Sequence, residues 1–132
     1  MKPTYDPIKT YHRKIDKKEL LRAIRWWKAN LMMSDWRIDL RMGGRRFGWG
    51  DGLTGEGCSN THTCSFCSEI YIDVVRCGVQ YCPLCVLMHE LAHIWLYANH
   101  ISTHDEGMVN LLEGLFYKAY CLDMNVKPGA LE

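Results

Sequence analysis

The first hydrophobic pattern in the chain is a stripe at helical spacing, which follows Asp16. Asp16 and Glu19 have the spacing of a capping box, in which two side chains satisfy the free N–H groups at the start of a helix. The sequence therefore predicts a helix from Asp16 to Met32 or Met33. The apolar positions that would pack into the core are Leu20, Ile24, Trp27 and Leu31.

Two shorter stretches alternate between apolar and polar residues, as half-buried strands do. In the first, Trp36, Ile38 and Leu40 alternate with polar residues. The second is Glu69–Val75, whose isoleucines and Val74 share one face. Between them lies a glycine-rich segment, Gly43 to Gly57, where we expect turns and a hairpin.

Two more helices are expected after the second strand. Pro83 suits the first turn of a helix that runs to about Asn99. A short connection, His100 to His104, leads to a last helix from about Asp105 to Leu122. The order of helix, strands, helix and helix predicts an α+β domain.

Composition limits the chain to one ordinary globular domain, residues 1–132. It has 132 residues, of which 48% are hydrophobic and 23% charged. We expect residues 1–15 to form a loose arm. The net charge of +1 gives no indication of a nucleic-acid partner. The polar N-terminus and the lack of an apolar run of about 18 residues indicate no export signal and no membrane partner. We therefore expect a cytoplasmic protein, in the host cytoplasm if the source is viral.

The chemical signal in the sequence is the run His89-Glu90-Leu91-Ala92-His93. On a helix, residues four apart lie about 40° from each other, so both imidazoles face one point. Glu90 lies beside the same point. Two neutral imidazoles can bind Zn²⁺, and a neighbouring carboxylate can accept a proton from water. We predict His89 and His93 as zinc ligands and Glu90 as the general base. The alternative, in which all three only form hydrogen bonds in the core, is costly because the surrounding residues are apolar.

A catalytic zinc needs a third protein ligand and an open position. We predict Glu106, because it begins the helix that a short turn folds back on the helix of His89. His104 is the next candidate, and the others downstream are His100, Asp105 and Glu113. A different interpretation is that Thr103 and Glu106 form a capping box and bind no metal. Asn110, four residues after Glu106, would support a ligand through a hydrogen bond.

At these residues the sequence resembles the gluzincin branch of the zincin metallopeptidases, whose third ligand is a glutamate on the following helix. Glu106-Gly-Met-Val-Asn110 stands where thermolysin-like members have E-x-x-x-D. The compact minigluzincins and ImmA-like peptidases are similar in size and layout. His89 to Leu96 with Glu106-Gly107 also resembles the peptidase region of plant organ-size regulators that carry LIM domains. SprT-like peptidases are a weaker match, because they have His-Gly where this chain has His104-Asp105.

The resemblance implies a compact zincin-like domain with a small twisted sheet. It also implies that Glu69–Val75 is the edge strand before the active-site helix. In zincins that strand pairs with an extended substrate. The substrate-binding residues would then be Glu69, Ile70, Tyr71, Ile72 and Asp73.

Seven cysteines form the second candidate site. Cys64-Ser-Phe-Cys67 and Cys82-Pro-Leu-Cys85 are two C-x-x-C pairs, and together they fit a structural zinc site with four thiolates. We therefore expect residues 58–85 to be a Cys-rich insertion around the edge strand. Disulfides or buried thiols are the alternative. Cys58, His62 and Cys77 are alternative ligands for this structural zinc site.

Two classes of function follow. The first is a zinc-dependent endopeptidase, a hydrolase that acts on a peptide or protein substrate, with one catalytic Zn²⁺ and a second structural one. The second is a non-catalytic, zinc-stabilised module that binds protein or nucleic acid. The buried Glu90 favours the enzyme, because it has no structural task in the module.

Overall fold

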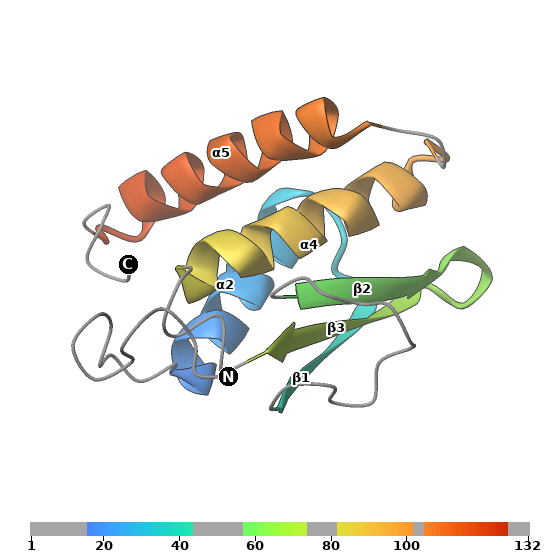
Figure 1. Cartoon of the computed structure of the whole chain (residues 1–132), viewed down its shortest axis with the longest axis horizontal. Helices are drawn as coiled ribbons and strands as arrows, with labels where there is room; N and C mark the ends of the chain where they lie inside the picture. The colour runs from blue at the N-terminus through green and yellow to red at the C-terminus, as the bar shows by residue number, and fades with distance from the viewer. Residues whose placement is uncertain (1–15, 44–56, 74–81, 102–104, 127–132) are drawn as a thin grey trace, which may run out of the picture.

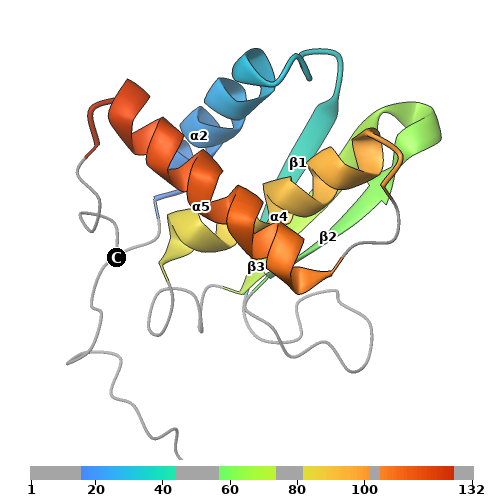
Figure 2. The same cartoon turned by 90° about the horizontal axis from the view of Figure 1, so that it is seen from above.

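The computed structural model describes residues 16–43, 57–73, 82–101 and 105–126. Within them, three helices and a three-stranded mixed sheet form an α+β domain, as predicted. Helix α4 lies between the sheet on one side and α5 on the other, and α2 packs beside it (Figures 1 and 2). The elements are α2 (Lys17–Asn30), β1 (Arg37–Gly43), β2 (Gly57–His62), the short 3₁₀ helix η1 (Thr63–Ser65), β3 (Cys67–Asp73), α4 (Pro83–Ala98) and α5 (Glu106–Asp123).

All three helices are where the hydrophobic pattern predicts them, within a few residues. Asp16 caps α2 by accepting a hydrogen bond from the N–H of Lys18, and Pro83 occupies the first turn of α4. None of the helices in the described part of the chain is long and apolar enough to cross a membrane. Residues 1–15, expected to be a loose arm, and 44–56, where a hairpin was expected, lie outside the described residues.

The C-terminal ends of the helices share one motif. After each helix, one residue has a positive φ, and the next backbone N–H bonds back to the carbonyl five residues earlier. This is the Schellman motif, in which glycine is the usual residue at the positive φ. Here that position holds Met32 after α2, His100 after α4 and Asn125 after α5. The helices therefore end without the glycine that normally marks a helix end in a sequence.

The sheet has the strand order β1-β3-β2. Strand β1 pairs parallel to β3 from Arg37↔Cys67 to Gly43↔Asp73, and β2 pairs antiparallel to β3 from Gly57↔Ile72 to His62↔Cys67. Both sides of β3 are thus occupied along its length. The prediction that Glu69–Val75 is an edge strand is wrong.

This arrangement removes the predicted substrate-binding role of Glu69 to Asp73. A substrate cannot add to a strand whose backbone groups already pair on both sides. Ile70 and Ile72 are fully buried in the core under the helices. Tyr71 and Glu69 lie on the opposite face, where the Tyr71 hydroxyl donates to Glu69.

The segment 58–85 is also not an insertion. It supplies β2 and β3, two of the three strands in the described part of the chain. Strand β2 has no apolar alternation, and polar contacts help to join it to β3. The buried Ser68 hydroxyl donates a hydrogen bond to the backbone carbonyl of Asn60. The same hydroxyl lies 3.2 Å from the hydroxyl of Thr61.

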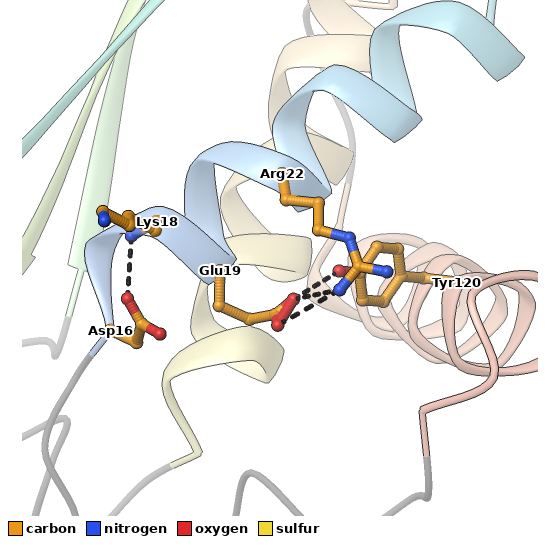
Figure 3. A network of polar contacts seen from close by, with 5 residues as sticks. All are labelled: Asp16, Lys18, Glu19, Arg22 and Tyr120. Carbon is orange, nitrogen blue, oxygen red and sulfur yellow. Dashed lines mark hydrogen bonds and ion pairs between the residues drawn. The ribbon is translucent and has the colours of Figure 1, made fainter.

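Polar contacts fix α5 against α2 at the end remote from Glu106 (Figure 3). The Tyr120 hydroxyl donates a 2.8 Å hydrogen bond to Glu19, which also pairs with Arg22. Nearby, the indole N–H of Trp26 donates to Asp123 at 2.6 Å. Glu19, expected to complete a capping box, thus bonds to the side chain of Tyr120 on another helix. These contacts hold the C-terminal end of α5 against α2, while the packing of α5 on α4 positions its first turn.

Candidate metal centre

Helix α4 presents His89 and His93 on the side that faces α5. The rest of the helix is largely buried, because the sheet covers the opposite side. The two rings, one turn apart, meet edge to face with centroids 5.1 Å apart. This confirms the predicted placement of both imidazoles on one face of a helix.

Glu106 meets these histidines from the first turn of α5. Asp105 is the N-cap, and its carboxylate accepts a 2.8 Å hydrogen bond from the N–H of Met108. A capping box that ends at Glu106 would need the N-cap three residues before it, whereas the N-cap is Asp105, so the capping interpretation of Glu106 is wrong. Thr103 itself lies outside the described residues. The carboxylate of Glu106 is instead directed at the two imidazoles, at the helix end where the macrodipole favours negative charge.

The three side chains converge. Oε1 of Glu106 is 3.2 Å from Nε2 of His89, and Oε2 is 3.7 Å from Nε2 of His93. One ligand atom from each residue can be chosen so that all three lie within 4.8 Å of one another. Among the residues that the structure describes, no other group of three His, Cys, Asp or Glu side chains meets this criterion.

These distances fit a zinc ion. In a tetrahedral site with Zn–N and Zn–O bonds of about 2.0–2.1 Å, neighbouring ligand atoms lie about 3.3 Å apart. The two separations between Glu106 and the imidazole nitrogens, 3.2 and 3.7 Å, are close to that value. The donor set of two nitrogens and one carboxylate is one that Zn²⁺ uses in catalytic sites. His89, His93 and Glu106 are therefore the residues that would hold the ion.

Glu113, seven residues or about two turns after Glu106, forms a hydrogen bond with the other ring nitrogen of His89. Its Oε1 lies 2.8 Å from Nδ1. In the tautomer with the proton on Nδ1, this N–H donates to the carboxylate, and the lone pair of Nε2 is directed at the site. The sequence indicated Glu113 only as a candidate third ligand and predicted Asn110 as the supporting residue. Asn110 is exposed, and Glu113 makes the contact with His89. The seven-residue spacing from Glu106 to Glu113, which places both on one helix face, was the signal that could have identified it.

The negative charge around His89 affects its protonation. The hydrogen bond with Glu113 raises the pKa of His89 above its ordinary value, against the opposing effect of burial. The charges of Glu90, Glu113 and Glu106 act in the same direction. Three carboxylates thus lie close to one imidazole, an arrangement that favours a cation.

Glu90 is buried on α4, next to His89. A buried carboxylate is costly unless it is paired or acts beside a cation. Its place on the helix, about 100° from His89, agrees with the predicted flanking position.

The four cysteines of the predicted structural zinc site do not come together. Cys64 and Cys67 lie at the start of β3, whereas Cys82 and Cys85 lie at the start of α4, after β3 has ended. The start of α4 lies at the opposite end of β3 from η1 (Figure 1), and no described cysteine belongs to a group of three ligand atoms within 4.8 Å of one another. The prediction of one four-cysteine site is wrong, because β3 separates the pairs.

The remaining candidates take no part in this group. His104 and Cys77 lie outside the described residues. His62 ends β2 with an exposed side chain, and His100 is exposed in the turn after α4.

No family model matches the sequence, and neither curated proteins nor solved structures include a match.

Proposed function

We propose that this chain is a zinc-dependent endopeptidase. The observation that carries the proposal is the convergence of His89, His93 and Glu106 at ligand spacing, beside the buried Glu90. Each of these residues has a distinct task in hydrolysis of a peptide bond.

The ligand residues would hold the ion and leave one position open. A bound Zn²⁺ would supply Lewis-acid polarisation of a peptide carbonyl and lower the pKa of water toward about 7. Glu113 orients His89 through Nδ1 and keeps the lone pair of Nε2 directed inward. Glu90 is the general base, which accepts the proton of the attacking water and passes it to the leaving amine.

Charge balance supports a divalent cation at this point. Glu90, Glu106 and Glu113 all act on His89 electrostatically. Without a cation these carboxylates repel one another, and the repulsion is strongest for buried groups. A Zn²⁺ ion bound by one nitrogen from each neutral imidazole, Nε2 of His89 and Nε2 of His93, would offset that repulsion.

Access also supports a catalytic rather than a closed structural site. The side chain of Glu106 is 68% exposed, and those of His89 and His93 are 25% and 20% exposed. The ligand group is thus open to solvent on the side of Glu106. Structural zinc sites are closed by four protein ligands, whereas a catalytic site keeps a position for water and substrate.

The decisive experiment compares the zinc-loaded chain with Glu90→Gln on an unfolded protein or a quenched fluorescent peptide mixture. The variant should keep one equivalent of zinc and lose cleavage by about 10²- to 10⁴-fold, the usual contribution of a general base. Asp39→Asn is the matched control, because it makes the same carboxylate-to-amide change on β1. Wild-type protein that binds zinc but cleaves nothing, or full activity in Glu90→Gln, would refute the enzyme and favour a zinc-stabilised binding module.

A further inference from the structure

Cys82 and Cys85 lie at the start of α4, apart from the candidate metal centre. Cys82 is the N-cap of the helix, and its carbonyl accepts a 3.0 Å hydrogen bond from the N–H of Val86. Cys85 is the third residue of the helix. Because β3 separates these two cysteines from Cys64 and Cys67, the two C-x-x-C pairs are chemically independent (Figure 1).

The backbone of the first turn brings the two cysteines within the range of a disulfide bond. Residues three apart in a helix have Cα atoms about 5 Å apart. A disulfide needs a Cα separation of about 4.4–6.8 Å. Pro83 and Leu84, between the two cysteines, are buried and anchor this turn in the core. Oxidation can therefore join Cys82 to Cys85 without unfolding α4.

The start of the helix also favours a thiolate at Cys82. A helix N-terminus carries a partial positive charge, and the thiolate is the reactive form of cysteine. The first turns of α2 and α5 contain Glu19 and Glu106, whereas the first turn of α4 contains no acidic residue. The positive end of α4 is thus not offset by a carboxylate of its own first turn.

The surroundings of the pair favour disulfide exchange over metal binding. Both cysteines are partly exposed, which gives a small reagent in solvent a path to them, whereas Cys121 is buried. A metal ion would need further ligands beside the two thiolates. Within the described part of the chain, no His, Cys, Asp or Glu side chain joins Cys82 and Cys85 at ligand spacing.

We propose that Cys82 and Cys85 form a reversible disulfide by exchange with a low-molecular-weight disulfide. The Cys82 thiolate attacks one sulfur of the small disulfide, which breaks its S–S bond and releases one small thiolate. Cys85 then loses its proton, and its thiolate attacks Sγ of Cys82 in the mixed disulfide and releases the second small thiolate. Two cysteine thiols are oxidised, and one small disulfide is reduced to two thiols.

This site lies on the helix of the candidate metal ligands but does not include them. Seven residues, about two turns, separate Cys82 from His89. Oxidation would close a short loop at the start of α4 and leave both imidazoles unmodified. The proposal is therefore independent of zinc binding and of peptidase activity.

The test equilibrates the full chain with mixtures of reduced and oxidised glutathione, alkylates the remaining thiols and maps the peptides by mass spectrometry. We expect a disulfide that joins Cys82 to Cys85 and is lost again in excess reduced glutathione. Cys85→Ser should stop at a mixed disulfide on Cys82. Cys82→Ser should slow the reaction of Cys85 by about tenfold or more, because the favoured thiolate is removed. Serine is a preferred N-cap, so this variant should keep α4, which circular dichroism checks.

The matched control is the double variant Cys64→Ser with Cys67→Ser, which removes a C-x-x-C pair of the same spacing at the other end of β3. It should form the disulfide between Cys82 and Cys85 as the wild type does. Retention of both thiols in excess oxidised glutathione overturns the proposal, and so does a disulfide from either residue to another cysteine. Zinc released in step with oxidation of Cys82 and Cys85 would show that the pair binds metal, which overturns it equally.

Discussion

Nδ1 of His89 lies 2.8 Å from Oε1 of Glu113, a contact that joins α4 to α5 beside the three candidate ligands. The contact sets the orientation of the imidazole, because it leaves Nε2 as the nitrogen directed at Glu106. The geometry of the candidate metal centre therefore depends on a carboxylate that is not one of the three candidate ligands.

Replacement of Glu113 tests this dependence. In Glu113→Gln the amide oxygen can still accept the hydrogen bond, but the negative charge is lost. We expect zinc affinity to fall by about 10- to 100-fold, measured by competition with a chelator of known affinity. Asn110→Ala is the control and should change affinity little, since Asn110 is exposed. A larger loss in Asn110→Ala than in Glu113→Gln would contradict the assignment.

The identity of the third ligand can be tested in the same assay. Glu106→Gln removes the carboxylate that meets both histidines, so we expect zinc affinity to fall by more than about 100-fold, beyond the effect of a supporting residue. The fold should remain, because Asp105 still caps α5. His104→Gln provides the comparison and should bind zinc as the wild type does. Should the two variants behave in the opposite way, His104 is the ligand.

The separation of the two cysteine pairs leads to a prediction on metal content. The double variant Cys64→Ser with Cys67→Ser should contain as much zinc per chain as the wild type, because these thiols lie at the far end of β3 from Cys82 and Cys85. Elemental analysis of protein purified under reducing conditions gives the ratio. Loss of one zinc equivalent in the variant would show that the pairs share an ion.

Tyr120 provides a test of how α5 is anchored to α2. Tyr120→Phe removes the hydroxyl that donates to Glu19, so the free energy of unfolding should fall by about 1.5–3 kcal/mol at pH 8, the usual value for a hydrogen bond to a charged group. Denaturant unfolding measures it. An unchanged stability would show that Tyr120 contributes only its ring, which packs against Trp26.

The same residue makes stability depend on alkaline pH. Burial, and then the hydrogen bond to Glu19, raise the pKa of Tyr120 above its ordinary value. Above pH of about 10 the unfolded chain releases this proton while the folded protein retains it, so the free energy of unfolding falls as pH rises. The difference between wild type and Tyr120→Phe should therefore shrink from pH 8 to pH 11. A constant difference would mean that the pKa is not raised.

The helices and the positions along them could be predicted because helical periodicity is a local property. Leu20, Ile24 and Trp27 are buried as their spacing indicated. The ends were less accurate, since residues such as Met32 and His100 take the positive φ at which glycine is usual. Strand β2 was missed because Gly57–His62 has no hydrophobic alternation and owes its place to backbone pairing with β3.

The sequence by itself determined that His89 and His93 share one side of a helix and that Glu90 flanks it, because four residues make about one turn whatever surrounds them. Only the tertiary structure decided which side chains meet them. The packing of α5 on α4 brings Glu106 and Glu113 to the histidines, and the pairing of β3 between two strands removes its edge and separates the cysteines. These outcomes depend on contacts between segments far apart in the chain, which no local pattern specifies.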